Sequence, residues 1–230
     1  MLICDNLLLQ QDDFTLSADL AFASGKVTAL IGPSGAGKST LLAALAGFLA
    51  PTAGRVLWGG DDLTGLPPGA RPISAIFQDN NLFPHLSIAQ NVGLGLRPSL
   101  RLSAQEAAAV DAALASVGLA GLGGRKPDAL SGGQQSRAAL ARVLLAERPV
   151  VLLDEPFAAL GPGLKDDMLD LVKTTLAGAG RTLLMVTHDP ADAKRIADQA
   201  VFVADGAASQ PIATEAFFNA PSPALAAYLG

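Results

Sequence analysis

The stretch "GPSGAGKST", residues 32–40, decides the fold that this sequence predicts. It matches G-x-x-x-x-G-K-[ST], the pattern of a loop that binds nucleotide phosphates. The apolar run at 27–31 predicts a buried strand before the loop, and a helix is expected from Lys38 onward. Because a glycine-rich turn between a strand and a helix is the context that the pattern requires, we predict a phosphate-binding loop here.

The chemistry of the loop residues fits this prediction. Glycines allow the backbone to curl with its N–H groups pointing inward, at the positive end of the helix dipole. We expect Lys38 to reach the β- and γ-phosphates and the Ser39 hydroxyl to ligate Mg²⁺. The residues predicted to bind the nucleotide here are Gly32, Pro33, Ser34, Gly35, Ala36, Gly37, Lys38, Ser39 and Thr40.

Length and composition narrow the class of protein. The 230 residues, half of them hydrophobic, suffice for one domain with a full core, and the formal net charge of -5 argues against a nucleic-acid partner. A single cysteine, Cys4, excludes an internal disulfide framework. The N-terminus lacks a positively charged leader, and the longest apolar run, 41–50, is about half the length of a membrane-spanning helix. We therefore expect a cytoplasmic chain.

The apolar patterns predict an α/β fold. Alternation at 16–22, together with a strand, glycine turn and second edge at 55–63, predicts a small antiparallel β layer. Strands and helices then alternate in the manner of a doubly wound core. The expected strands are 72–78, which ends at Gln78, then 150–154, 182–187 and 200–204, and the expected helices between them are 164–177 and 190–198.

The middle third of the chain predicts a helical lobe. Ser103 and Glu106 have the spacing of a capping box, and the alanine-rich helix that they open is expected to stop at Gly118. A further helix is expected from Ser131 to a point before Pro149. We predict a single domain, 1–230, with a core of 1–85 and 131–230 and an inserted lobe at about 86–130.

Two more motifs indicate the protein family that this chain resembles. "LSGGQ" stands at 130–134, about ninety residues after the phosphate loop, and "VVLLDEP" follows at 150–156. With these motifs in this order, the chain resembles the ATP-binding-cassette (ABC) family over essentially its whole length. The resemblance implies a RecA-like P-loop core with an antiparallel layer and a helical subdomain. It also implies a homodimer in which one chain's signature binds the γ-phosphate of ATP on the other, through Ser131, Gly132, Gly133 and Gln134.

The resemblance also implies roles at the ends of strands. Asp154 is expected to hold Mg²⁺ and Glu155 to orient the attacking water, while Gln78 contacts Mg²⁺ and His188 touches the γ-phosphate. The implied catalytic residues are Lys38, Glu155 and His188, and the implied metal ligands are Ser39, Gln78 and Asp154. The other histidine, His85, is expected to be structural or to lie at a partner surface.

Two features depart from the family pattern. Gly161 stands where many members carry an acid, which removes a carboxylate from a loop that contacts the second subunit. The aromatic residue that stacks on adenine has no clear counterpart, and either Phe14 or Gln11 is a candidate for its place.

The short, acidic form resembles the ATPase subunit of a bacterial importer. That implies a peripheral position on the cytoplasmic side of the inner membrane, a separate permease and a periplasmic binding protein. Residues 66–98 resemble the ATPases of thiamine importers, with "NNLF" at Asn80–Phe83 and "NVGLGL" at Asn91–Leu96. An importer of another small cation, such as a polyamine or ferric iron, and a soluble ABC ATPase without transport are the alternatives. The residues expected to dock the permease are Leu82, Phe83 and Leu86.

Overall fold

A parallel β-sheet forms the centre of the protein. The structure is a computed structural model that describes residues 1–78 and 81–230. The central strands lie in the order β9-β3-β8-β7-β6 and are all parallel. Every residue of β3, β7 and β8 is buried, as expected for parallel strands that are covered on both faces. The bounds are β3 (Val27–Ile31), β6 (Ile73–Ile76), β7 (Val150–Asp154), β8 (Thr182–Val186) and β9 (Gln199–Ala204).

Strand β6 is shorter than its sequence predicts. The prediction that it runs to Gln78 is wrong, because the strand ends at Ile76. The backbone N–H of Phe77 donates to Oδ1 of Asn81 at 3.1 Å, so this group does not continue the ladder with β7. Gln78 therefore lies in the turn beyond the strand.

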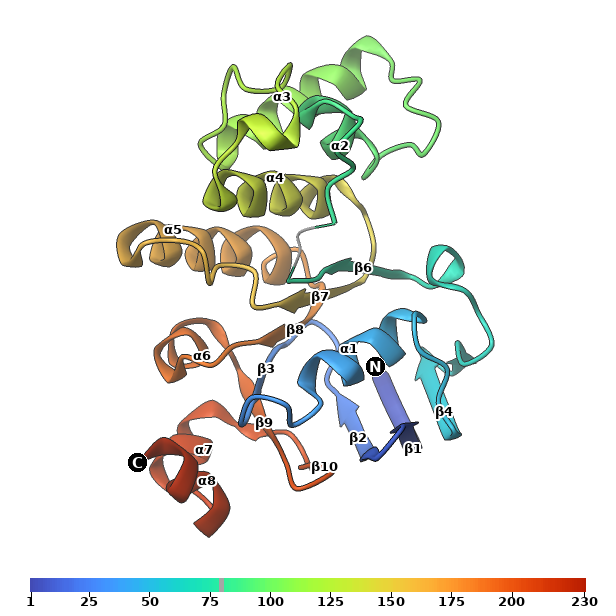
Figure 1. The fold of residues 1–230 in the computed structure, drawn as a ribbon, viewed down its shortest axis with the longest axis vertical. Helices are drawn as coiled ribbons and strands as arrows, with labels where there is room; N and C mark the ends of the chain where they lie inside the picture. The colour runs from blue at the N-terminus through green and yellow to red at the C-terminus, as the bar shows by residue number, and fades with distance from the viewer. Residues whose placement is uncertain (79–80) are drawn as a thin grey trace.

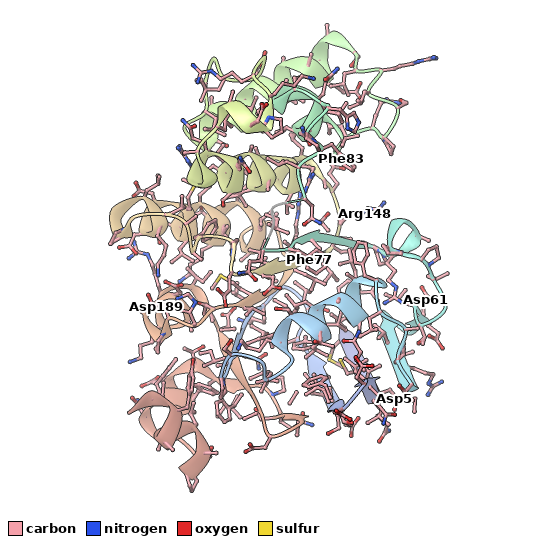
Figure 2. All side chains as sticks on the ribbon, in the orientation of Figure 1. Asp5, Asp61, Phe77, Phe83, Arg148 and Asp189 are labelled. Carbon is pink, nitrogen blue, oxygen red and sulfur yellow. The ribbon has the colours of Figure 1, made fainter. Side chains whose placement is uncertain are left out.

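An antiparallel layer extends the sheet on one side, as predicted (Figure 1). The two-residue strand β10 joins the layers, since it pairs parallel with β2 and antiparallel with β9. Asp5 and Asp61 mark this layer in Figure 2, and Asp5 pairs with Arg55 of the neighbouring strand at 2.6 Å. The strands are β1 (Leu2–Gln11), β2 (Phe14–Phe22), β4 (Ala53–Trp58), β5 (Asp61–Asp62) and β10 (Ala207–Ala208), while β11 (Ile212–Ala213) pairs with β9.

Three helices gather at one end of the molecule (Figure 1). They are α2 (Ile88–Gly93), α3 (Ala104–Ser116) and α4 (Gly132–Leu145). Short 3-10 turns lie elsewhere in the chain order, at Pro68–Ala70 between β5 and β6 and at Pro127–Ala129 between α3 and α4. The predicted capping box of α3 is confirmed, since Ser103 and Glu106 exchange both hydrogen bonds. Gly118, with φ of 69°, takes the left-handed conformation that lets the chain turn away after α3.

The remaining helices cover the sheet. They are α1 (Lys38–Ala46), α5 (Pro162–Val172), α6 (Pro190–Ile196), α7 (Thr214–Asn219) and α8 (Pro223–Leu229). The helix expected at 164–177 is α5 continued by a π-helical turn at Lys173–Ala177. None of the helices in the described ranges is long and apolar enough to cross a membrane.

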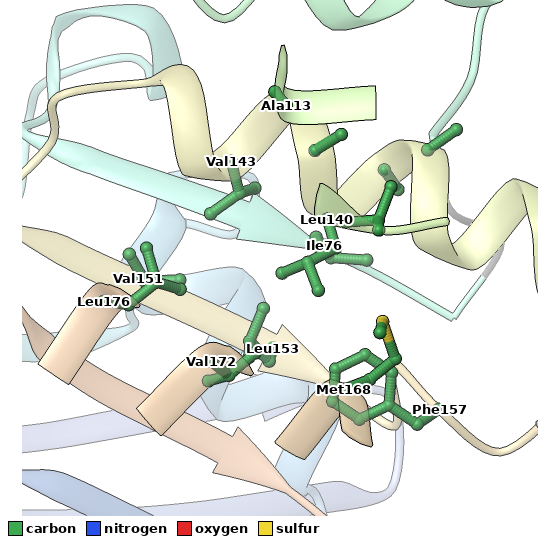
Figure 3. Packing of buried hydrophobic residues seen from close by; sticks show 14 of the residues in the cluster. Ile76, Ala113, Leu140, Val143, Val151, Leu153, Phe157, Met168, Val172 and Leu176 are labelled. Carbon is green, nitrogen blue, oxygen red and sulfur yellow. The ribbon is translucent and has the colours of Figure 1, made fainter. Parts of the chain in front are cut away.

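One apolar core joins the helical end to the sheet (Figure 3). Leu140 and Val143 of α4 share a buried cluster with Ile76 of β6 and with Val151 and Leu153 of β7. Val172 and Leu176 extend the same cluster along this face of the sheet. Helix α4 is thus packed directly on strands whose ends carry the candidate site, and α2 and α3 pack on α4.

Candidate active site

The glycine-rich loop lies between β3 and α1 and encloses the side chain of Lys38. Its Nζ donates hydrogen bonds of 2.7 Å to the carbonyl oxygens of Gly32 and Pro33. Burial lowers the pKa of Lys38, while the carboxylates of Glu155 and Asp154 oppose that shift. Helix α1 begins without a side-chain cap, so its first N–H groups stay available to an anion beside the lysine.

Two glycines of the loop are required by packing. A Cβ at Gly32 would lie 2.0 Å from the carbonyl oxygen of Val203 in β9. A Cβ at Gly37 would lie 2.4 Å from Cζ of Phe14 in β2. The loop is therefore held between strands of both layers: a side chain at Gly32 would clash with the backbone of β9, and one at Gly37 would require the Phe14 ring to move.

The predicted residues converge because the central strands are parallel. Their carboxyl ends meet at one edge of the sheet, where Asp154 ends β7 and the phosphate loop, Gln78 and His188 each follow a strand. A cavity of about 590 Å³ opens there. It is lined by Gln11, Phe14, Gly32, Ser34, Gly35, Gly37, Lys38, Ser39, Thr40, Gln78, Glu155, His188 and Tyr228. Pro33 and Ala36 belong to the loop but are not among these lining residues.

Asp154 ends β7 and shares a hydrogen bond with Ser39, but it is not among the described residues that line the cavity. Its side chain is buried, and burial raises its pKa; neighbouring Glu155 adds to the rise, while the Ser39 hydrogen bond and Lys38 oppose it. Within the described residues, no group of three or more His, Cys, Asp or Glu could hold a metal ion. The oxygens of Ser39, Asp154 and Gln78 nevertheless suit Mg²⁺, which takes one or two carboxylates and completes its shell with water and substrate phosphates.

Glu155 is fixed by its backbone and faces His188. Its φ of 46° is uncommon for a residue other than glycine, and its N–H donates to the carbonyl oxygen of Val186 at 3.2 Å. Oε2 of Glu155 lies 3.3 Å from Nδ1 of His188, whose side chain is 65% exposed. A carboxylate and an imidazole thus stand together at the wall of the cavity, where the carboxylate can act as a general base toward a water molecule.

The signature residues lie away from this cavity. Ser131 caps α4 and forms a capping box with Gln134. A Cβ at Gly133 would lie 2.7 Å from Cδ2 of Leu160, and one at Gly132 would lie 3.8 Å from Cβ of Ala159. None of the four signature residues is among those that line the cavity of the described chain. They pack instead on the loop that follows Glu155, with Ser131 and Gly132 exposed.

The structure also places the two departures from the family pattern. Gln11 and Phe14 both line the cavity, so both remain candidates for the contact with adenine. Tyr228, from the C-terminal helix α8, lines it too and packs against Phe202 at 5.9 Å between ring centroids. The sequence offers no signal for Tyr228 beyond its being the single tyrosine. Gly161 precedes α5, and a Cβ there would contact nothing within 4 Å.

The segment after β6 is organised by a buried amide. Asn91 accepts a hydrogen bond from the N–H of Phe83 at 2.7 Å and donates one back to its carbonyl oxygen at 3.0 Å. Asp79 and Asn80, the latter part of the "NNLF" stretch, lie outside the described residues. His85 is exposed, and its ring packs edge-on against Phe83 at 5.9 Å.

An apolar groove of about 530 Å³ lies beside this segment. Phe77, Phe83 and Arg148 mark it in Figure 2, and Phe48, Leu94 and Leu96 also line it. The side chains of Phe48 and Phe83 are 64% and 47% exposed. Of the three residues expected to form a dock, only Phe83 is among the described residues that line the groove; Leu82 instead packs against the core. The prediction missed Phe48, because an exposed phenylalanine after a helix has no periodic signal.

Comparisons with known families, sequences and structures all find ABC-type ATP-binding proteins. A family model described as ABC transporter matches residues 16–158. The thiamine import ATP-binding protein ThiQ of Cereibacter sphaeroides is 60% identical over 230 residues, the whole of both chains. The ThiQ protein of Ruegeria sp. is 55% identical over the same length. A dimeric structure of the ATP-binding cassette MJ0796 in a post-hydrolysis state, bound to ADP and Pi, superposes with a TM-score of 0.83 at 28% identity, covering 93% of this chain and 99% of that one.

Proposed function

The chain belongs to the ABC transporter family, and we propose that it is the ATP-hydrolysing subunit of a bacterial thiamine importer. The assignment of thiamine as the transported substrate rests on one observation, the 60% identity to a thiamine import ATP-binding protein along the whole chain. The residues themselves never meet the transported molecule in this assignment, because they bind and hydrolyse ATP. A separate permease therefore carries the substrate, and the chain works on its cytoplasmic face as a peripheral subunit.

In this function the loop at 32–40 binds the triphosphate. The ammonium of Lys38 and the N–H groups at the start of α1 face the β- and γ-phosphate oxygens. Ser39, Asp154 and Gln78 would hold Mg²⁺, which when bound would neutralise charge on the phosphates. The proximity of Ser39 to Asp154 supports this ligand set.

Hydrolysis uses the pair at the cavity wall. Glu155 accepts a hydrogen bond from the attacking water and orients it toward the γ-phosphate. His188, 3.3 Å from Glu155, contacts the γ-phosphate and keeps the carboxylate in place. The unusual backbone of Glu155 supports this role, since strained conformations persist where function requires them.

A second copy of the chain completes each site. Ser131 and Gly132 are exposed at the start of α4, where N–H groups meet the positive end of the helix dipole. We place this end over the triphosphate of a partner chain, in a head-to-tail homodimer. The similar cassette MJ0796 is described as dimeric, which supports that arrangement.

The permease docks in the groove beside β6. A short helix with apolar side chains fits a surface on which Phe48 and Phe83 are exposed and Arg148 stands at the rim. The predicted effect of Phe48→Ser with Phe83→Ser is loss of permease binding with unchanged ATP affinity. Ile212→Ser is the matched control, because Ile212 is 44% exposed and lies on β11.

Reconstitution tests the substrate. The chain is assembled in proteoliposomes with the permease and periplasmic binding protein from the same organism, and ATP turnover is measured with thiamine, spermidine or ferric iron. We expect stimulation by thiamine and none by the other two. Stimulation by spermidine or iron without thiamine would replace the proposed substrate, and failure of the chain to associate with any permease would favour an ABC ATPase without transport.

A further inference from the structure

A lysine joins helix α5 to the segment that carries His188. Nζ of Lys165 lies 2.6 Å from Oδ2 of Asp189 and 2.6 Å from Oδ1 of Asp192. The Lys165 and Asp192 side chains are only 19% and 11% exposed. Lys165 and Asp192 also line a small cavity of about 90 Å³ together with Glu155 and His188.

The same two carboxylates fix the backbone on both sides of His188. Oδ1 of Asp189 caps α6 by accepting from the N–H of Ala191 at 2.9 Å, which leaves Oδ2 for Lys165. Asp192 accepts from the hydroxyl of Thr187 at 2.7 Å, and that hydroxyl in turn accepts from the N–H of Asp189 at 3.1 Å. His188 lies between the two residues that this network holds.

The position of Lys165 in the chain is equally specific. Residues 156–164 contain no charged side chain. Lys165 is therefore the first charged residue after Glu155, and it stands in the first turn of α5. Glu155 is thus connected to His188 in two ways. One is their direct contact, and the other runs along the loop to Lys165 and through its ion pair to Asp189, the neighbour of His188.

We propose that Lys165 is a positioning residue for hydrolysis, whose two ion pairs hold His188 against Glu155 and tie this contact to the loop at 156–161. The inference rests on the proposed function, because it takes Glu155 and His188 as the hydrolytic pair. Lys165 acts through Asp189 and Asp192 and contacts no phosphate. Movements of the 156–161 loop are thereby transmitted to His188.

A second ion-pair cluster between the same two helices provides the control. Arg195 of α6 pairs with Asp170 at 2.7 Å and Asp166 at 3.3 Å, both on α5. If Lys165 only held α5 to α6, removing Arg195 should have a similar effect. A positioning role predicts that only the loss of Lys165 changes catalysis.

The test compares Lys165→Met, Lys165→Arg and Arg195→Met in the full chain. We expect Lys165→Met to lower kcat for ATP about tenfold or more, because small misplacements of reacting groups are costly, with KM changed by less than about twofold. Lys165→Arg should restore most of kcat, and Arg195→Met should leave it unchanged. If Lys165→Met alone does not fold, the double variant Lys165→Met with Asp192→Asn replaces it in the test. The second substitution removes the Asp192 carboxylate, which would otherwise be buried without its partner.

Histidine NMR provides a readout that a loss of stability does not mimic. The chain has two histidines, so His85→Gln assigns the ring signals of His188. We expect Lys165→Met to shift or broaden the His188 signals and to leave those of His85 unchanged. Unchanged His188 signals, a kcat within about twofold of the parent, or an equal loss in Arg195→Met would overturn the inference.

Glu155→Gln and His188→Ala, measured in the same assay, separate this inference from the proposed function. If both variants lose turnover while Lys165→Met keeps it, only the positioning role is wrong. If both variants hydrolyse ATP at the parent rate, the hydrolytic pair itself is misassigned and the positioning role is overturned with it.

Discussion

Glu155 and His188 meet at 3.3 Å although each follows a different strand of the parallel sheet. The contact depends on the register of β7 and β8, in which Asp154 lies opposite Val186. The next N–H along β7, that of Glu155, then bonds the Val186 carbonyl oxygen and turns the Glu155 side chain toward the loop after β8. The candidate hydrolytic pair is therefore a product of sheet geometry.

Glu155→Gln is predicted to separate binding from hydrolysis. Glutamine preserves the size of the side chain but cannot act as a base, so turnover should fall by roughly two to four decades. ATP affinity should stay near that of the parent, because the phosphates are held by the loop at 32–40. Phosphate release and calorimetric titration measure the two quantities, and a variant with parental turnover would remove Glu155 from this role.

Lys38→Ala is predicted to abolish tight nucleotide binding. The ammonium lies inside the phosphate loop, and hydrogen bonds from a charged donor are each worth about 1.5–3 kcal/mol, so ATP affinity should fall at least tenfold. Lys26→Ala is the control, since Lys26 is exposed and pairs with Asp198 before β3. Calorimetry that gives Lys38→Ala the parental affinity would contradict the phosphate assignment.

The head-to-tail dimer is predicted to form a specific disulfide. Ser34 of the phosphate loop and Ala129 before the signature are both exposed, so cysteines at these positions should join two chains when ATP is trapped by Glu155→Gln. Native Cys4 does not interfere, because it is fully buried and burial raises its pKa to about 12. We expect the crosslink with ATP and not with ADP, measured on non-reducing gels. Its absence in the trapped state would contradict the shared site.

The sequence predicted the buried central strands and the glycine-rich turn after β3 well, because their signals are local. Uninterrupted apolar runs marked β7 and β8, and the glycine and lysine spacing marked the loop between β3 and α1. Ser103 and Glu106 marked the start of α3 through a capping box, which needs only four consecutive residues, whereas the capping box of Ser131 and Gln134 was found only in the structure.

The features that the sequence did not predict depend on contacts between segments that are distant along the chain. Tyr228 reaches the cavity only because α8 packs beside β9, and Lys165 meets Asp189 only because α5 and α6 are neighbours. Two-residue strands such as β10 carry no pattern of their own. Phe48 lines the groove because the end of α1 lies beside Phe77, with which it makes an edge-on ring contact at 5.3 Å.

Glu106 is predicted to make the folding stability of the protein fall at low pH. Hydrogen bonds from the backbone N–H of Ser103, then from Arg97 and the Ser103 hydroxyl, lower the pKa of Glu106 from 4.5 to about 2. Because the folded pKa is depressed, this contribution to stability is fully present above about pH 4.5 and is lost as pH falls toward 2. Glu106→Gln retains a capping side chain but loses the ion pair with Arg97, so the variant should be less stable than the parent at pH 7.

Urea midpoints at pH 7, 5, 4 and 3 measure this difference between parent and Glu106→Gln. The gap should be constant from pH 7 to 5 and should narrow below about pH 4.5, as the unfolded chain takes up a proton that the folded chain refuses. Glu147→Gln, at an exposed site, controls for the removal of one negative charge. A gap of equal size at pH 7 and pH 3 would show that the carboxylate of Glu106 contributes through its shape in the capping box and not through its charge.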